Sequence, residues 1–229
     1  MTLPEITSPA TMPPATDPAA FVRANTRLMP VALVPEVCLH LTNAVVPLWQ
    51  ATEAELDRIM LPPPFWAFAW AGGQALARYV LDHPGTVAGR RVLDLASGSG
   101  LVAIAAAKAG ATVTAAEIDG FAAAAIALNA AVNGVEIGIE TTDLLDDPAT
   151  GAFDVVLVGD AFYERALAAR ALAFLDRQAA AGAAVLIGDP GRCYLPQARL
   201  TRLASFAVPV ARDVEDRDIK QTAVYAFGI

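Results

Sequence analysis

Apolar positions in the second half of the chain follow two alternating periods. Short runs rich in Val, Leu and Ile are typical of buried strands, and longer stretches with apolar residues three or four apart are typical of helices. The runs predict strands over 91–95, 112–117, 136–143, 153–160 and 182–190. The stretches between them predict helices over 98–108, 120–134 and 163–180. This alternation predicts an α/β fold with a mostly parallel sheet and helices on both faces.

The last 35 residues depart from this alternation. Their pattern predicts a helix from Leu195 to Ser205 and then two strands, 206–212 and 221–229. The charged segment DVEDRD separates the two strands, which can therefore pair as a hairpin. We expect this C-terminal hairpin to add an antiparallel strand to the parallel sheet.

The first half of the chain predicts an extension before the regular fold. Asp17 can cap a helix that runs to about Met29, because Pro18 suits the first helical position. Residues 36–43 alternate enough for a short strand, with Val37, Leu39 and Leu41 on one face. The capping-box pattern Thr-Glu-Ala-Glu at 52–55 predicts a helix to about residue 60.

Three prolines at 62–64 end this extension, and a helix is expected from Gly72 or Gly73 to Asp82. An unusually dense aromatic segment leads into it: Phe65, Trp66, Phe68 and Trp70. The domain organisation is therefore predicted as a flexible Pro-rich lead over 1–16, an N-terminal extension over 17–62 and the main domain over 63–229.

Composition narrows the classes of function. The 229 residues are 55% hydrophobic with a net charge of -8, which argues against a binder of nucleic-acid phosphates. Cys38, Cys193, His40 and His83 stand alone without ligand spacing, so we expect no metal. No apolar run approaches the roughly 18 residues of a membrane span, and the N-terminus lacks the basic residues of a targeting signal. The expected protein is soluble and cytoplasmic.

The segment LDLASGSGLVA, Leu93 to Ala103, is the first candidate site. It predicts a strand, a turn containing Gly98 and Gly100, and a helix whose N-terminus a ligand can approach. The turn fits Gly-x-Gly-x-x-Ala, a pattern that suits a dinucleotide and an adenosyl cofactor equally well. The glycines alone do not separate the two.

Acidic residues at successive strand ends favour the adenosyl cofactor. Asp94 lies just before the loop, where it would repel a pyrophosphate by about 1 to 4 kcal/mol but attract a sulfonium or ammonium. Glu117 is placed for the ribose hydroxyls and Asp143 for the adenine amino group. The alternative is purely structural: Asp94 would order the loop, Glu117 or Asp119 would cap a helix, and Asp143 would be a turn residue.

At these residues the chain resembles the class I S-adenosylmethionine-dependent methyltransferases. VLDLASGSG stands where that family has its glycine-rich first motif, and VTAAEID where it has its ribose-binding acid. The resemblance implies a Rossmann-like, seven-stranded sheet with an antiparallel final hairpin, and the cofactor S-adenosylmethionine with S-adenosylhomocysteine as product. It departs at Ala96, where the family commonly has glycine. It implies that Ser97, Ile118, Leu144 and Gly159 also contact the cofactor.

The end of the fourth strand, GDAFYE at 159–164, is expected to face the methyl group. It lacks the Asn-Pro-Pro-Tyr sequence with which enzymes of this fold orient base amines and amides. A carboxylate at Asp160 can instead hold an ammonium, and aromatic faces can carry cation–π attraction. The sequence therefore favours a lysine amine, which must lose a proton before it reacts.

Together with the aromatic segment and IGDPGRCYLP, this stretch resembles the lysine methyltransferases of the electron transfer flavoprotein β subunit, relatives of the ribosomal protein L11 methyltransferase. The resemblance implies a monomer acting on that protein, with no nucleic acid or membrane partner. It places Trp70, Gly72 and Gly73 at the methionine end of the cofactor. Asp160 would orient the lysine, with Phe162 and Tyr163 along its channel.

Several alternatives stay open at this point. The acceptor can instead be ribosomal protein L11 or a small amine, and a non-catalytic or dinucleotide-binding Rossmann module remains the rival class. Phe162 and Tyr163 can simply pack the following helix on the sheet. Asp189 and Arg192 are expected to form an ion pair within a loop.

Overall fold

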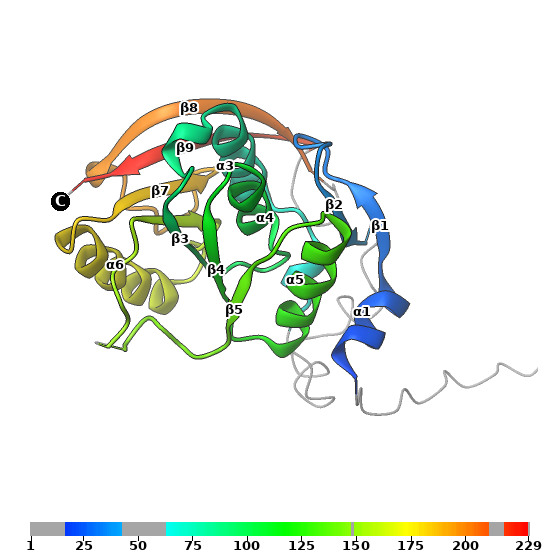
Figure 1. The fold of residues 1–229 in the computed structure, drawn as a ribbon. Coiled ribbons are helices and arrows are strands. Elements are labelled where there is room, and N and C mark those ends of the chain that lie inside the picture. The colour runs from blue at the N-terminus through cyan, green and yellow to red at the C-terminus, as the bar shows by residue number, and fades with distance from the viewer. Residues whose placement is uncertain (1–16, 43–62, 148, 211–217, 229) are drawn as a thin grey trace, which may run out of the picture.

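The computed structural model describes residues 17–42, 63–147, 149–210 and 218–228. These form one seven-stranded sheet beside a two-stranded hairpin (Figure 1). The sheet contains β3 (Arg91–Leu95), β4 (Thr112–Ala116), β5 (Gly138–Glu140), β6 (Val155–Gly159), β7 (Ala184–Asp189), β8 (Leu200–Pro209) and β9 (Ile219–Phe227). Their spatial order is β5-β4-β3-β6-β7-β9-β8. The first five are parallel, and β9 is antiparallel to both β7 and β8, which confirms the predicted fold class.

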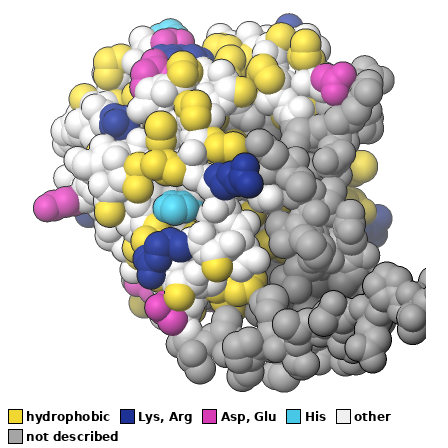
Figure 2. All heavy atoms as spheres, turned by 90° about the vertical axis from the view of Figure 1, so that its right-hand side faces the viewer, with side chains coloured by type: hydrophobic (Ala, Val, Ile, Leu, Met, Phe, Trp, Pro, Cys, Tyr) yellow, Lys and Arg dark blue, Asp and Glu magenta, His cyan; other side chains and the backbone are white. Residues whose placement is uncertain are grey.

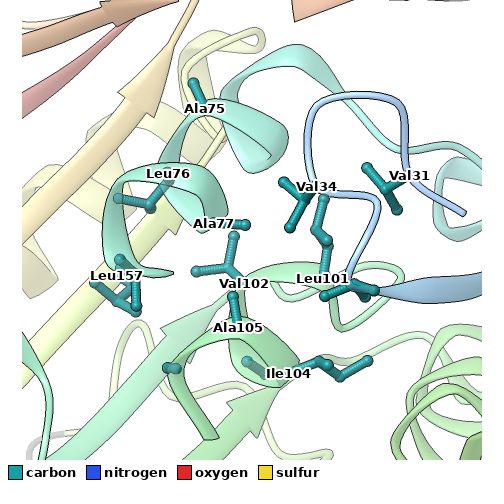
Figure 3. Packing of buried hydrophobic residues seen from close by; sticks show 14 of the residues in the cluster. Val31, Val34, Ala75, Leu76, Ala77, Leu101, Val102, Ile104, Ala105 and Leu157 are labelled. Atoms are coloured by element: carbon teal, nitrogen blue, oxygen red, sulfur yellow. The ribbon is translucent and has the colours of Figure 1, made fainter. Parts of the chain in front are cut away.

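Helices cover both faces of the sheet, as predicted (Figure 1). They are α3 (Ala71–Asp82), α4 (Leu101–Lys108), α5 (Gly120–Val132) and α6 (Arg165–Ala180). Alternate residues of each strand enter two separate cores: Leu157 packs with α3 and α4, whereas Val156 and Val158 pack with α6. Figure 3 shows the first core, where Leu76 and Val102 of the two helices lie beside Leu157. Both faces of β6 are thus buried, which explains its continuous apolar sequence.

The C-terminal helix predicted over Leu195–Ser205 is wrong. Only a short 3-10 turn, η3 (Gln197–Arg199), forms there, and β8 begins at Leu200 and pairs with β9 from Leu200 to Pro209, apart from an irregularity between Arg202 and Ala204. Leucines at 195, 200 and 203 imitate helical spacing, but Leu203 lies at an irregularity in the strand and is exposed. β9 pairs with β7 on one edge and with β8 on the other, so strand pairing overrides the local pattern.

The N-terminal segment differs in one boundary. Asp17 caps α1 (Pro18–Asn25) by accepting from the Ala19 N–H, but the helix ends four residues before Met29. Residues 27–30 instead form β1 (Arg27–Pro30), which pairs with β2 (Cys38–Leu41). Leu39 and Leu41 are buried as predicted. The lead over 1–16 and the helix expected over 52–60 lie outside the described residues.

This N-terminal hairpin joins the main domain through α5. The side chain of Asn129, completely buried, accepts from the His40 N–H and donates to the Ser99 carbonyl. Asn133 bonds both the N–H and the carbonyl of Cys38. Figure 2 shows the surface on this side, where acidic and basic side chains lie among apolar ones. Two asparagines therefore connect the outer edge of β2 to the helix.

Smaller differences follow from loops and caps. The helix expected from Gly98 begins at Leu101, because Gly98 and Gly100 have φ angles of 55° and 80°. The helix expected from Tyr163 begins at Arg165, with Glu164 as its N-cap. Strand β5 is only Gly138–Glu140, so Asp143 lies in the loop that follows it.

Candidate active site

The glycine loop after β3 is organised by Asp94. Its Oδ2 accepts from the Ser97 Oγ at 2.5 Å and from the Ala103 N–H at 3.0 Å. Ala103 lies in the first turn of α4, where backbone N–H groups have no partner within the helix. Because the left-handed N-cap, Gly100, has no side chain to satisfy such groups, Asp94 supplies this contact from the strand.

Burial places Asp94 beneath the loop. The residue is 2% exposed, and desolvation raises the pKa of its carboxyl to about 7 despite the hydrogen bonds from Ser97 and Ala103. The contacts of Asp94 therefore match the loop-ordering role that the sequence left open. The charge of Asp94 is also a weaker argument against a bound pyrophosphate than the sequence suggested.

Glu117 follows β4 and closes the other side of the loop. Its Oε2 accepts from the Gly98 N–H at 2.9 Å, and its Oε1 accepts from the Asp119 N–H at 3.1 Å. Asp119 itself caps α5 by accepting from the Phe121 N–H. Burial raises the pKa of Glu117, and its two backbone donors oppose that rise. Each oxygen keeps a lone pair, so the carboxylate can still accept from two hydroxyl groups.

A pocket open to solvent lies beside Glu117. Its walls come from the ends of β3 and β4, the loop after β5, Ala161 after β6 and the first turns of α6. They include four residues predicted for the cofactor: Glu117, Ile118, Asp143 and Leu144. Ile118 is 67% exposed, a large apolar surface on the rim of a pocket. The strand ends thus converge as the sequence predicted.

Asp143 is engaged by protein groups. Its Oδ2 accepts from Arg170 of α6 at 2.7 Å, and its Oδ1 accepts from the Leu145 N–H. The hydrogen bond from Arg170 lowers the pKa of this carboxyl. The carboxylate therefore links the pocket rim to α6, and the adjacent backbone remains as the polar group for an adenine.

Glycines bring the start of α3 against the ends of β6 and β7. A Cβ atom on Gly72 would lie 2.2 Å from the Gly188 carbonyl oxygen, and one on Gly159 would lie 3.0 Å from the Gly73 Cα. Gly72 is buried in this contact. Two of the glycines predicted to touch the cofactor, Gly72 and Gly159, are thus needed for the packing of backbone on backbone.

Asp160 ends β6 with an unusual backbone. Its φ of 56° lies in the left-handed region, which costs a non-glycine residue roughly 1 to 2 kcal/mol. Its Oδ2 accepts from the Gly73 N–H at 3.1 Å, and its Oδ1 accepts from Arg192 Nη2 at 2.8 Å. Burial raises the pKa of Asp160, and the charge of Arg192 acts against that rise.

The two aromatic residues that follow Asp160, Phe162 and Tyr163, lie in different environments. Phe162 is 0% exposed and packs under α6, so its position matches the packing alternative and it has no surface toward a substrate. Tyr163 is 49% exposed and its ring centroid lies 5.8 Å from that of Phe65. Phe65 also contacts Trp70 at 6.0 Å, and the Trp70 indole N–H donates to the Phe65 carbonyl. The aromatic surface near Asp160 thus comes from residues 65, 70 and 163.

Sequence reasoning missed the role of Arg192. The ion pair expected between Asp189 and Arg192 does not form within the described residues. Instead the Asp189 Oδ1 accepts the backbone N–H groups of Gly191 and Arg192, and the guanidinium pairs with Asp160. The loop sequence showed that a positive charge is present, but it did not show which carboxylate the Arg192 side chain would pair with.

No group of three or more His, Cys, Asp or Glu side chains in the part of the chain that the structure describes is arranged to hold a metal ion. No helix among these residues is long and apolar enough to cross a membrane.

Comparisons with known proteins agree with this geometry. Residues 68–176 match the family model of the methyltransferase small domain. Two solved structures share the fold: magnesium protoporphyrin IX methyltransferase from Synechocystis with bound S-adenosylmethionine (TM-score 0.52, 16% identity, 78% of this chain and 86% of that one) and a 16S rRNA methyltransferase from T. thermophilus (TM-score 0.52, 20% identity, 70% and 44%). Sheet order, glycine loop and acidic strand ends define a class I methyltransferase, whose methyl donor is S-adenosylmethionine.

Curated relatives identify the family within this class. The electron transfer flavoprotein beta subunit lysine methyltransferases of Danio rerio and Rattus norvegicus are each 37% identical, over 91% of this chain and 82% and 83% of theirs. A ribosomal protein L11 methyltransferase from Geobacter sulfurreducens is 39% identical over only 49% of this chain. The chain belongs to the electron transfer flavoprotein beta subunit lysine methyltransferase family and is a protein-lysine methyltransferase.

Proposed function

We propose that this enzyme methylates lysine side chains of the electron transfer flavoprotein β subunit. The observation that carries the choice of substrate is the 37% identity to curated enzymes of that name across nine-tenths of the chain. Similarity to the ribosomal protein L11 methyltransferase covers only half of the chain, which makes that protein the weaker candidate. The geometry at the end of β6 supports an amine acceptor independently.

The residues of the pocket fit an adenosyl cofactor. Ile118 and Leu144 offer apolar surfaces for a flat base, and both oxygens of Glu117 can accept from ribose hydroxyls. A Cβ atom on Gly98 would meet nothing within 4 Å, so the space above the loop is open to a ligand. S-adenosylmethionine bound there supplies an electrophilic methyl group and a positive charge. Ser97 and Gly100 act by holding the loop in shape.

Acceptor recognition falls to the end of β6. Asp160 presents a buried carboxylate whose direction is set by contacts on both oxygens. An aliphatic lysine stem can lie along Tyr163 and Trp70, while its nitrogen is attracted to Asp160. The nitrogen must lose a proton before its lone pair can form the new N–C bond, and a nearby positive charge favours that loss. Positioning then governs the displacement.

The remaining expectations are part of the same proposal. The chain acts as a monomer in the cytoplasm, on protein rather than on nucleic acid or membrane, and its net charge of -8 supports the exclusion of nucleic acid. The domain organisation proposed is a Pro-rich lead over 1–16, an N-terminal extension over 17–62 and the methyltransferase domain over 63–229. The match of residues 68–176 to the methyltransferase model is consistent with that last boundary.

The test is a methyl-transfer assay with labelled S-adenosylmethionine and three acceptors: purified flavoprotein β subunit, ribosomal protein L11 and a small amine. We expect label on lysine of the β subunit, located by mass spectrometry. Asp160→Asn should lower kcat at least about 100-fold while the dissociation constant of S-adenosylhomocysteine changes only a few-fold. Label on L11 or the amine alone would overturn the proposed substrate, and an equal loss of cofactor affinity would reassign Asp160.

A further inference from the structure

Arg192 lies in the loop after β7, and its backbone is held firmly. Its N–H donates to the Asp189 Oδ1 at 2.7 Å, and its carbonyl accepts from the Leu195 N–H at 3.1 Å. Asp189 is completely buried at the end of β7, and its Oδ2 has no hydrogen-bond partner among the residues that the structure describes. A buried carboxyl with one oxygen unpaired is costly, which indicates that the shape of this loop is important.

The guanidinium of Arg192 reaches from this loop to Asp160. Its Nε and Nη2 both donate to the Asp160 Oδ1, at 3.1 and 2.8 Å. Its Cζ lies 5.7 Å from the centroid of the Trp70 ring, within cation–π range. The planar fork is thus directed by a carboxylate and an aromatic face together, an arrangement that lysine cannot reproduce.

Charged and polar groups around Asp160 come from three neighbouring segments. The loop after β7 contributes the positive Arg192, the end of β7 contributes the buried Asp189, and the start of α3 contributes the Gly73 N–H. Desolvation raises the pKa of Asp160, whereas Arg192 and the α3 backbone lower it. Without Arg192, the desolvation that raises the pKa of Asp160 would be opposed mainly by the backbone N–H groups at the start of α3.

We propose that Arg192 is a positioning residue for methyl transfer, which fixes the charge and the direction of the Asp160 carboxylate while Trp70 holds the guanidinium in place. This inference rests on the proposed function, because it assigns Arg192 a role through Asp160 in binding the acceptor amine. The same positive charge beside the amine also favours its neutral, reactive form.

The experiment compares Arg192→Gln and Arg192→Lys with Arg165→Gln. Arg165 is a matched control, because it is exposed and lies over the Tyr194 ring of the same loop without a hydrogen bond to Asp160. Arg192→Gln should move the acidic limb of the kcat profile upward by about one pH unit, since loss of an adjacent positive charge raises a carboxyl pKa. Arg192→Lys should move it less, and Arg165→Gln should leave it unchanged. Thermal melting confirms that each variant is folded.

A second measurement is independent of the acceptor. The titration of Asp160 is followed by carboxyl carbon NMR, with its signal assigned by its loss in Asp160→Asn. A raised pKa in either Arg192 variant supports the inference, even if the wild-type enzyme labels none of the three acceptors and the proposed substrate is wrong. An unchanged Asp160 pKa, or activity reduced equally at every pH, would overturn it. If Arg192→Gln does not fold, the comparison of Arg192→Lys with wild type decides.

Discussion

Single residues at this site have functions that depend on their partners more than on their chemical type. Asp94 and Asp160 are both buried carboxyls that accept from backbone N–H groups, but of the two only Asp160 also forms an ion pair with a guanidinium. Glu117 lies less deeply and borders the pocket. The first therefore orders the loop, whereas the proposed function assigns the second to the acceptor and the third to the cofactor.

Burial of Asp94 predicts a pH dependence of stability. Its pKa is raised from 3.8 to about 7 in the folded protein, so the folded state binds the proton more tightly than the unfolded state between those values. Stability from this group is therefore fully present below about pH 4 and is lost as the pH rises toward 7. Over that pH range, the free energy of unfolding of Asp94→Asn should rise relative to that of the wild type by on the order of 3 kcal/mol. Urea unfolding without cofactor at pH 4, 5.5 and 7.5 measures this, and a constant difference would contradict it.

Ala96, where the family motif commonly has glycine, has a strained backbone. Its φ is 55°, in the left-handed region that glycine adopts without cost. Ala96→Gly should therefore stabilise the protein by about 0.5 to 1 kcal/mol, because relief of strain exceeds the added entropy of the unfolded chain. Ala181→Gly is the control: Ala181 is exposed with a φ of -80°, so it should destabilise slightly. Equal destabilisation by both changes would contradict the strain at residue 96.

Glu117 should contribute measurably to cofactor affinity. Glu117→Ala removes charge-assisted hydrogen bonds to the ribose and should cost roughly 1.5 to 3 kcal/mol in binding. Calorimetric titration with S-adenosylhomocysteine measures this. Asp154→Asn is the matched control, because Asp154 pairs with Arg91 at the amino end of the sheet. An unchanged dissociation constant for Glu117→Ala would remove it from the cofactor site.

At the scale of elements, helix α3 contacts the sheet through backbone atoms. The start of α3 lies directly on the ends of β6 and β7, and this contact is what allows the Gly73 N–H to reach Asp160. The glycine pair at 72–73 and the single glycines before the acids at 160 and 189 mark the place, but a ligand contact and a packing contact require the same residue. Only the structure distinguishes them.

Two neighbouring glycines provide the test of this contact. Gly72→Ala should destabilise the fold by about 2 to 4 kcal/mol, because its Cβ would overlap the Gly188 carbonyl oxygen. Gly73→Ala meets nothing closer than 3.9 Å and should be neutral or stabilise by up to about 1 kcal/mol through helix propensity. Guanidinium unfolding of both variants measures the difference. If Gly73→Ala is stable but binds S-adenosylhomocysteine weakly, residue 73 contacts the cofactor as well.

At the scale of the whole molecule, the described part of the extension belongs to the core. Val22 of α1 and Leu39 of β2 are completely buried, and α1 packs on α5 with Phe21 and Phe121 edge to face. The same helix α5 reaches the glycine loop through Asn129 and Ser99. The N-terminal hairpin therefore supports the loop of the cofactor site from outside.

Deletions should separate the lead from the extension. A chain beginning at residue 17 should keep the wild-type melting temperature within a few degrees. A chain beginning at residue 43 exposes the buried Asn129 and the apolar surface under Val22 and Leu39, and should lose several kcal/mol or fail to fold. Calorimetric melting measures both. A stable shorter chain would show that the domain boundary predicted near residue 62 marks an independent unit.

The sequence by itself determined the sheet class, the five parallel strands and the convergence of Glu117 and Asp143 on one edge. These follow from apolar period and chain order, which are local properties. The tertiary structure decided that residues 200–205 are strand, that Phe162 is core and that Arg192 faces Asp160. Each of these depends on a tertiary contact, namely with β9, with the core under α6 and with the residue after β6. Neither a spacing nor a propensity contains that information, because the competing free energy comes from contacts that exist only after the chain has folded.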